Sequence, residues 1–200
     1  MRIHLIRHGQ TNWNKEKRVQ GHSESTLTEQ GQQQARDLAI TLQQYPISNV
    51  FCSSSIRTRQ TSELLFEQRP VQTHYHDELR EIFLGPWEGK LQSEIRNLFP
   101  EQFENFWNAP HRFAQDDAES FEDVQQRGLT ILKQILSNPY EEVAIVSHGV
   151  IIKAILCHLD NRPIAQLWEP PIMHNCAHSI IVKDSHEVAP RITQFAGIAQ

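Results

Sequence analysis

Short apolar runs alternate along this chain with longer stretches in which apolar residues recur every three or four positions. Continuous apolar runs predict buried strands, and they occur at residues 2–7, 50–52, 71–76, 143–147, 178–183 and 190–195. Helical spacing predicts helices over residues 28–44, from the serines at 53–55 to about 66, from 120 onward, and over 149–159. Strands that alternate with helices favour an α/β fold. We expect a three-layer α/β/α sandwich around a mostly parallel sheet.

The helix that begins near residue 120 has the clearest start signal. Ser120 and Asp123 have the spacing of a capping box, in which each side chain accepts a hydrogen bond from the other residue's backbone. The residues predicted to form its buried face are Val124, Ile131, Leu132 and Ile135. At the helix near residue 55, one of Ser53, Ser54 and Ser55 is the expected N-cap.

Residues 77–118 interrupt the alternation of strands and helices. Their apolar signals are mixed, and Pro86, Pro100 and Pro110 divide them into short helical pieces. We interpret this stretch as a lid-like insertion beside the functional site, within a single domain that covers residues 1–200.

Composition narrows the class of protein. Hydrophobic residues make up 38% of the 200 positions and charged residues 22%, as in a soluble globular domain. The net charge of −5 argues against a nucleic-acid partner, although local arginines still permit a small anionic substrate. No apolar stretch is long enough to span a membrane. The first strand begins at Arg2, which argues against a cleavable signal, and Cys52, Cys157 and Cys176 lack a C-x-x-C spacing. We therefore expect free thiols and a cytoplasmic protein.

Two tripeptides, Arg7-His8-Gly9 and Ser147-His148-Gly149, each follow a predicted strand. Ligands of open α/β sheets bind at the carboxyl ends of the strands, so the two histidines are expected to lie near each other. A neutral imidazole can attack a phosphoryl group, and an arginine beside it suits phosphate oxygens. His8 is thus the candidate nucleophile, and His148 the candidate cation or acid.

A third basic residue, Arg57, is placed in the first turn of the helix that follows Ser53–Ser55. Free N–H groups and the helix dipole favour an anion at such an end, and Arg57 can add a bidentate contact.

Glu81 is the candidate general acid. It lies between Leu79 and Phe83, and apolar surroundings would make its carboxyl group hold a proton more tightly. Glu88 is a rival for this role. Both residues can also be ordinary loop carboxylates.

The pair His74 and His76 has the spacing of two metal ligands on one side of a strand. No third ligand follows at a diagnostic spacing, and a strand with one exposed face gives the same pattern. We expect neither a metal nor another cofactor.

Five motifs in this order resemble the histidine phosphatase superfamily, whose members include cofactor-dependent phosphoglycerate mutases and many small phosphatases. They are Arg7 to Asn14, Gln20-Gly21 with Leu27 to Gly31, Ser53 to Thr61, Leu79-x-Glu81 with Trp87-Glu88-Gly89, and Ser147-His148-Gly149. The resemblance runs from Arg2 to about Lys183 and implies a phosphoglycerate mutase-like fold.

The resemblance also implies a mechanism without a metal. His8 would form a phosphohistidine intermediate, and Glu81 would act as proton donor and acceptor. The phosphate would be held by Arg7, Asn14, Arg57, His148 (as an imidazolium) and the neighbouring Gly149. Gln20 and Gly21 would lie near the substrate.

Within the superfamily, mutases require a consecutive arginine pair after the L-x-E region and an Asn after the second His-Gly. This chain has His111-Arg112 and Val150 at these places. Its expected lid is aromatic, and the residues predicted to contact leaving groups are Phe83, Phe106, Trp107 and Phe113. The pattern resembles the broad-specificity phosphatases, which hydrolyse small phosphomonoesters. The alternatives are a phosphatase for one metabolite such as a ribazole phosphate, a phosphoglycerate mutase, and a phosphate-binding module without turnover.

Overall fold

The computed structural model describes residues 1–184, 186 and 189–200. These residues form a seven-stranded sheet in the order β3-β2-β4-β1-β5-β6-β7. The strands are β1 (Arg2–Arg7), β2 (Asn49–Ser53), β3 (Gln72–His76), β4 (Glu142–Ser147), β5 (His178–Val182), β6 (Arg191–Phe195) and β7 (Ile198–Ala199). Strands β3, β2, β4 and β1 are parallel to one another, and β5 to β7 extend the sheet in antiparallel pairs.

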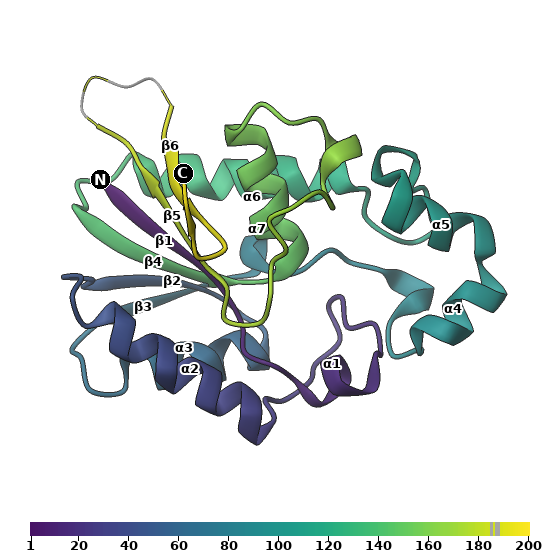
Figure 1. The fold of residues 1–200 in the computed structure, drawn as a ribbon, viewed down its shortest axis with the longest axis horizontal. Coiled ribbons are helices and arrows are strands. Elements are labelled where there is room, and N and C mark those ends of the chain that lie inside the picture. Colours follow the sequence, from purple (N-terminus) through teal and green to yellow (C-terminus); the bar gives the residue numbers. More distant parts are fainter. Residues whose placement is uncertain (185, 187–188) are drawn as a thin grey trace.

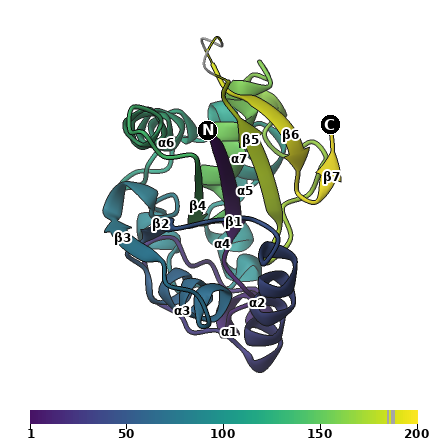
Figure 2. The ribbon, with the colours of Figure 1, turned by 90° about the vertical axis from the view of Figure 1, so that its left-hand side faces the viewer.

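Helices cover both faces of the sheet (Figure 1). Helices α2 (Glu29–Leu42) and α3 (Ile56–Phe66) pack on one face, and α6 (Phe121–Leu136) and α7 (Gly149–Leu159) pack on the other. Figure 2, turned by 90°, shows the same three layers from the side. The expected α/β/α sandwich is therefore confirmed. The shorter helices α1 (Asn12–Glu16), α4 (Gln92–Leu98) and α5 (Pro100–Asn108) were not predicted individually.

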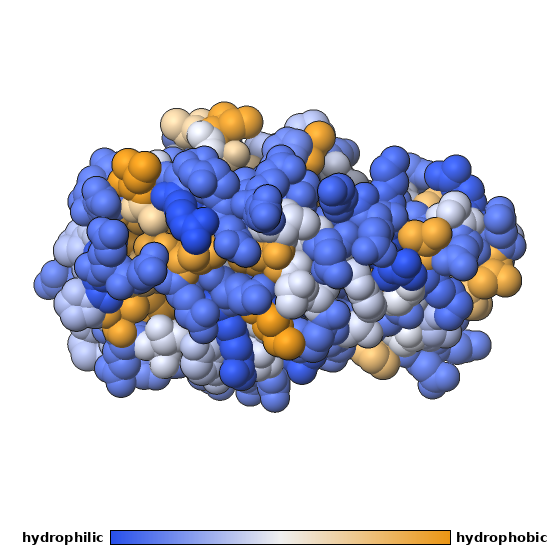
Figure 3. All heavy atoms as spheres, turned by 90° about the horizontal axis from the view of Figure 1, so that it is seen from below, coloured by the Kyte–Doolittle hydropathy of each residue, from blue (hydrophilic) through white to orange (hydrophobic). Residues whose placement is uncertain are grey.

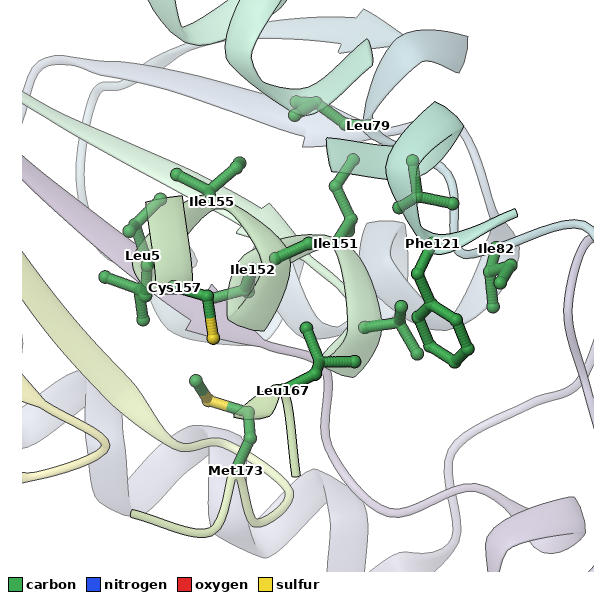
Figure 4. Close-up of a cluster of buried hydrophobic side chains, with 14 of the residues drawn as sticks. Leu5, Leu79, Ile82, Phe121, Ile151, Ile152, Ile155, Cys157, Leu167 and Met173 are labelled. Atoms are coloured by element: carbon green, nitrogen blue, oxygen red, sulfur yellow. The ribbon is translucent and has the colours of Figure 1, made fainter. Parts of the chain in front are cut away.

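The strands read as continuous apolar runs because both faces of the sheet are buried. Side chains alternate along β1, so Ile3 and Leu5 join the core under α6 and α7, whereas Ile6 joins the core under α2 and α3. Figure 4 shows part of the first core, where Leu5 and several side chains of α7 lie together. All four residues predicted for the buried face of α6 are buried.

The two N-caps predicted from the sequence, at α6 and α3, lie at the expected positions. Ser120 Oγ accepts a hydrogen bond from the backbone of Asp123 at 3.1 Å, and the Asp123 carboxylate accepts one from the Ser120 backbone. At α2, for which no cap was predicted, the Thr28 hydroxyl accepts a hydrogen bond from the Gly31 N–H at 3.0 Å. At α3, Ser55 occupies the N-cap position, but its hydroxyl makes no capping bond to a described residue. Glu24 Oε2 instead accepts from the Ile56 N–H at 2.8 Å.

Residues 77–118 lie beyond the carboxyl ends of the parallel strands, on the right of Figure 1. They contain α4, α5 and the short 3₁₀ helices Asp77–Leu79, Gly85–Trp87 and Pro110–Arg112. Prolines begin several of these pieces, because proline is tolerated in the first turn of a helix. Trp87 packs at the centre of this segment against Phe99, Phe103, Phe106 and Phe113.

The side of the molecule on which α2 and α3 lie is mostly hydrophilic, with separate apolar patches (Figure 3). This agrees with helices that bury one face only. Within the described residues, no helix has the length and apolar character needed to cross a membrane.

A buried row of hydrogen-bonded side chains crosses the sheet from Glu142 at the start of β4, through His4 in the middle of β1, to His178, which pairs with Ile6 near the carboxyl end of β1. His4 Nε2 donates to Glu142 Oε1 at 2.8 Å, and His4 Nδ1 accepts from His178 Nε2 at 2.8 Å. Burial lowers the pKa of His4, and burial next to His4 lowers the pKa of His178 to about 3. Both imidazoles are therefore neutral in the folded protein at neutral pH.

The buried neutral histidines predict that acid lowers the stability of the folded protein. An unfolded histidine binds its proton near pH 6.5, but folded His178 binds it only near pH 3, so the unfolded state takes up more protons between these values. Stability present above pH 6.5 is lost as the pH falls, by about 1.4 kcal/mol per pH unit for one such group. Urea unfolding at pH 6.5 and pH 5 should show a smaller fall for His178→Gln than for the unchanged protein. An equal fall in the free energy of unfolding for both proteins would contradict the lowered pKa of His178.

Candidate active site

The carboxyl ends of β1 and β4 bring the two His-Gly motifs together. These strands are parallel neighbours, in a register that pairs Arg7 with Ser147. His8 and His148 therefore leave the sheet side by side, with 5.3 Å between the centroids of their rings.

A pocket of about 430 Å³ opens at this edge, a volume typical of small-molecule sites. The predicted site residues that line it are Arg7, His8, Asn14, Gln20, Gly21, Arg57, Glu81 and Gly149. His148 is fully buried and does not line the pocket itself, but it contacts Arg57, which does.

His8 has the tautomer that a nucleophile requires. Its Nδ1–H donates to the carbonyl oxygen of Gly9 at 2.8 Å, which leaves Nε2 unprotonated. Burial, together with the charges of Arg57 and Arg7, holds the pKa of His8 well below its usual value. Nε2 has no hydrogen-bond partner among the described residues. His8 therefore presents a neutral, oriented nitrogen to the pocket.

Arg57 is a fixed cation. Its Nη1 and Nη2 donate to the carbonyl oxygens of Ser23 and Gly21, at 2.9 and 2.7 Å, and its Nε donates to His148. Burial lowers the pKa of Arg57 to about 10, so the guanidinium stays charged at neutral pH. The sequence predicted that free N–H groups at the start of α3 would bind the anion. The Ile56 N–H is not free for this, because it donates to the Glu24 carboxylate.

Arg7 is the second cation. Its Nη1 donates to the carbonyl oxygen of Met173, and its buried Nε has no hydrogen-bond partner among the described residues. A Cβ atom at Gly149 would lie 3.4 Å from this Nε, so the glycine allows Arg7 to lie close to the start of α7. Arg7 and Arg57 together give the pocket a positive end.

His148 corrects one expectation. The sequence suggested an imidazolium, but burial and the neighbouring Arg57 hold the pKa of His148 well below its usual value. Its Nδ1 accepts from Arg57 Nε at 3.2 Å, and its Nε2–H donates to Ser53 Oγ at 2.8 Å. In this structure His148 is neutral, and it orients Arg57 rather than adding a charge.

Glu81 also has surroundings that differ from those expected. Its carboxylate is not enclosed by Leu79 and Phe83 but lies at the start of α7. There it accepts from the Val150 N–H, at 3.1 and 3.2 Å to its two oxygens, and from the Ile151 N–H at 3.3 Å. The helix amides fix the position of the carboxylate on the wall of the pocket.

Glu88, the rival acid, organises a loop. Its Oε1 accepts from the backbone of His22 at 2.8 Å and of Leu84 at 3.1 Å, and its Oε2 accepts from the backbone and hydroxyl of Ser23. Gly21 has a φ of +54°, and a Cβ atom there would lie 2.1 Å from Glu88 Oε1. Glu88 therefore fixes the loop at residues 21–23, whose carbonyl groups accept hydrogen bonds from Arg57.

Asn14 and Gln20 are held by hydrogen bonds to neighbouring loops. Asn14 Oδ1 accepts from the Thr11 backbone and from Asn175 Nδ2, both at 3.1 Å. Gln20 Oε1 accepts from the Thr11 hydroxyl at 3.0 Å. These contacts fix both amides on the wall next to His8.

Only two of the four predicted leaving-group residues line the pocket, namely Phe106 and Trp107. Phe83 lies against the ring of His22, and Phe113 is buried in the aromatic centre of residues 77–118. The apolar lining residues that were not predicted for this role are Val19, Ile82, Leu84, Val150, Trp168, Ile172 and Met173.

Two cations on the pocket wall, Arg18 and Lys153, were also missed. Both are bound to other protein groups: Arg18 Nε pairs with Glu16 at 3.0 Å, and Lys153 Nζ donates to the carbonyl oxygen of Pro171 at 2.9 Å. Both lie within four residues of a motif, Arg18 between Asn14 and Gln20 and Lys153 one helical turn after Gly149, so their positions in the sequence could have suggested this placement.

His74 and His76 lie on the same side of β3, and both rings pack against Phe51. The described residues hold no group of three or more His, Cys, Asp or Glu side chains that could bind a metal ion.

A neutral imidazole nitrogen beside two buried guanidinium groups defines a site for transfer of a phosphoryl group to histidine. Residues 3–194 match the model of the histidine phosphatase superfamily, branch 1. Among solved structures, Bacillus stearothermophilus YhfR superposes with a TM-score of 0.95 and 37% identity, over 99% of this chain and 98% of that one.

Curated relatives include the adenosylcobalamin/alpha-ribazole phosphatase of Salmonella typhimurium, 28% identical over 90% of both chains. Phosphoserine phosphatase 1 of Hydrogenobacter thermophilus is 28% identical over 84% of this chain and 80% of its own. This chain belongs to the histidine phosphatase superfamily and is a phosphatase.

Proposed function

We propose that this phosphatase hydrolyses small phosphomonoesters of several kinds, without a metal ion, through a phosphohistidine on His8. The observation that carries the proposal is the orientation of His8, whose free Nε2 faces a pocket with Arg7 and Arg57 at one end. Fixed charges placed where a phosphoryl group gains negative charge are the main source of catalysis in such reactions.

The reaction takes place in two steps. His8 Nε2 attacks phosphorus, the bond between phosphorus and the ester oxygen breaks, and Glu81 gives its proton to the departing oxygen. Glu81 then takes a proton from water as the water oxygen attacks phosphorus, and the bond to Nε2 breaks. The products are the alcohol, inorganic phosphate and the original enzyme.

The outer pocket supports broad specificity. Its walls include Phe106, Trp107 and Trp168, which bind a leaving group through apolar contact rather than through specific hydrogen bonds. The charges of Arg18 and Lys153 are engaged by Glu16 and by backbone carbonyl groups. An aryl or alkyl group fits this wall better than a second anion does.

The proposed role of residues 77–118 is that of a lid, which supplies Phe106 and Trp107 within a single domain.

A second candidate is a phosphatase for one metabolite, such as alpha-ribazole phosphate. The observation that favours it is the similarity to the Salmonella typhimurium enzyme across 90% of both chains. A panel of phosphosugars, nucleotides, aryl phosphates and alpha-ribazole phosphate decides between the two. Comparable turnover of several classes supports broad specificity, and turnover of one class supports the dedicated enzyme. We propose a cytoplasmic location for either function.

We expect hydrolysis of an aryl phosphate to be far more efficient than mutase activity. Each charge-assisted contact missing for the carboxylate of a phosphoglycerate weakens binding by about 1.5–3 kcal/mol, so two missing contacts lower affinity by roughly a hundredfold or more. The measurement compares phosphate release from p-nitrophenyl phosphate with interconversion of 2- and 3-phosphoglycerate in the presence of 2,3-bisphosphoglycerate.

Both assays contain EDTA, because arginines supply the charge that a metal provides in other phosphatases. A mutase rate above the rate of aryl phosphate hydrolysis would place the chain with the mutases. Loss of activity in EDTA that divalent ions restore would exclude the metal-independent mechanism.

A further inference from the structure

Asn175 contacts the phosphate end of the pocket from a segment that no motif predicted. It lies between the short 3₁₀ helix Ile164–Gln166 and β5, and it is partly buried. Its Nδ2 donates to Asn14 Oδ1 at 3.1 Å and to the carbonyl oxygen of His8 at 3.3 Å. We propose that Asn175 is a positioning residue that sets the orientation of the Asn14 amide toward the transferred phosphoryl group. This inference rests on the proposed function.

The orientation of both amides follows from groups whose roles are chemically fixed. The backbone N–H of Thr11 can only donate, so the Asn14 atom that faces it at 3.1 Å is the oxygen. The carbonyl oxygen of His8 can only accept, so the Asn175 atom that faces it is the nitrogen. Asn175 therefore adds a second donor to Asn14 Oδ1, and the orientations assigned to the two amides are consistent with each other.

This arrangement leaves the Asn14 NH₂ group available. Asn14 lines the pocket with His8, and its Nδ2 has no hydrogen-bond partner among the described residues. An NH₂ group attracts a phosphate oxygen, whereas the amide oxygen would repel it. The direction of the amide thus decides whether Asn14 strengthens or weakens phosphate binding, and Asn175 favours the productive direction.

The backbone around Asn175 is held by other contacts. The Cys176 N–H donates to the carbonyl oxygen of His8 at 3.2 Å, and the Arg7 N–H donates to the carbonyl oxygen of Ala177 at 3.1 Å. Arg7 Nη1 also donates to the carbonyl oxygen of Met173. Removal of the Asn175 amide leaves these contacts in place, so its effect on activity should come through Asn14.

A double-mutant cycle with p-nitrophenyl phosphate tests the inference. Asn175→Ala should lower kcat/KM by about tenfold, the factor expected for the loss of one hydrogen bond. In an Asn14→Ala background, the same change should have no further effect. Inorganic phosphate should inhibit Asn175→Ala about tenfold more weakly than the unchanged enzyme, because phosphate uses the same donor. A merely structural role would give the same loss in both backgrounds, and that result would overturn the inference.

Asn175→Asp provides a second variant. Its carboxylate offers only acceptors to Asn14 Oδ1 and to the His8 carbonyl oxygen, so it repels the amide oxygen that the Thr11 N–H also holds and displaces the Asn14 side chain from its position beside the phosphate. We expect a larger loss than with Asn175→Ala, and a smaller loss in the Asn14→Ala background. If Asn175→Ala unfolds below the assay temperature, the cycle of Asn175→Asp with Asn14→Ala decides whether Asn175 acts through Asn14.

The matched control is Asn138→Ala, an exposed asparagine whose Nδ2 contacts the Gln134 carbonyl oxygen near the end of α6. It should leave kcat/KM unchanged. If the unchanged enzyme does not hydrolyse the aryl phosphate, the proposed function fails. If it does and the two changes act independently, only the role of Asn175 fails.

Discussion

His8→Ala is expected to abolish turnover of every phosphomonoester. Among the described residues, the substitution removes the neutral imidazole nitrogen that faces the pocket, and the two ring nitrogens of the neutral His148 are bonded to Arg57 and Ser53. Enzyme quenched during turnover of a ³²P-phosphomonoester should carry an acid-labile, alkali-stable label, as expected for a phosphohistidine, and His8→Ala should carry none.

Two controls make this result specific to the nucleophile. Thermal unfolding of His8→Ala should show that the fold persists, because the backbone contacts of His8 do not depend on its ring. The second control is His74→Ala, which changes a histidine on β3 that packs on Phe51. This variant should keep its label. A label of unchanged stability on His8→Ala would mean that another residue is the nucleophile.

Glu81→Gln is expected to slow alkyl phosphomonoesters far more than p-nitrophenyl phosphate. An alkoxide needs a proton as it leaves, whereas nitrophenolate leaves readily without one. General acids contribute about 10²–10⁴-fold, so the contrast between the two substrates should approach this range. The glutamine keeps the shape of the side chain, and its amide oxygen can still accept from the N–H groups at the start of α7.

The first step must be measured by itself, because Glu81 also activates water in the second. Rapid-quench formation of the phosphoenzyme gives this step for both substrates. Glu88→Gln is the matched comparison, since Glu88 contacts His22, Ser23 and Leu84. It should slow both substrates by the same factor. Equal losses for the two substrates in Glu81→Gln, with unequal losses in Glu88→Gln, would exchange the roles of these residues.

Periodicity was sufficient to predict the architecture. The strands and main helices lie close to their predicted limits, because continuous apolar runs and capping signals such as Ser120 with Asp123 are local. The meeting of His8 with His148 was also predictable, since parallel strands deliver their carboxyl ends to one edge.

The surroundings of the site residues could not be predicted in the same way. Two of the N–H groups that Glu81 binds belong to Val150 and Ile151, 69 and 70 residues further along the chain, whereas the sequence showed only its neighbours Leu79 and Phe83. The neutral state of His148 depends on its burial and on Arg57, which is brought next to it by a different strand and helix. Asn175 lies in a loop whose path depends on tertiary packing.

The hydrogen bonds of Glu88 have a consequence for exchanging parts between relatives. Because Glu88 holds the loop that grips Arg57, residues 77–88 belong functionally to the phosphate-binding half of the enzyme, although they are continuous with α4 and α5. Trp87 lies in this same stretch but packs on Phe99, Phe103, Phe106 and Phe113. A chimaera that takes Phe106 and Trp107 from a relative must therefore keep Trp87 matched to the rings around it, while it leaves Glu88 and the loop around Arg57 unchanged.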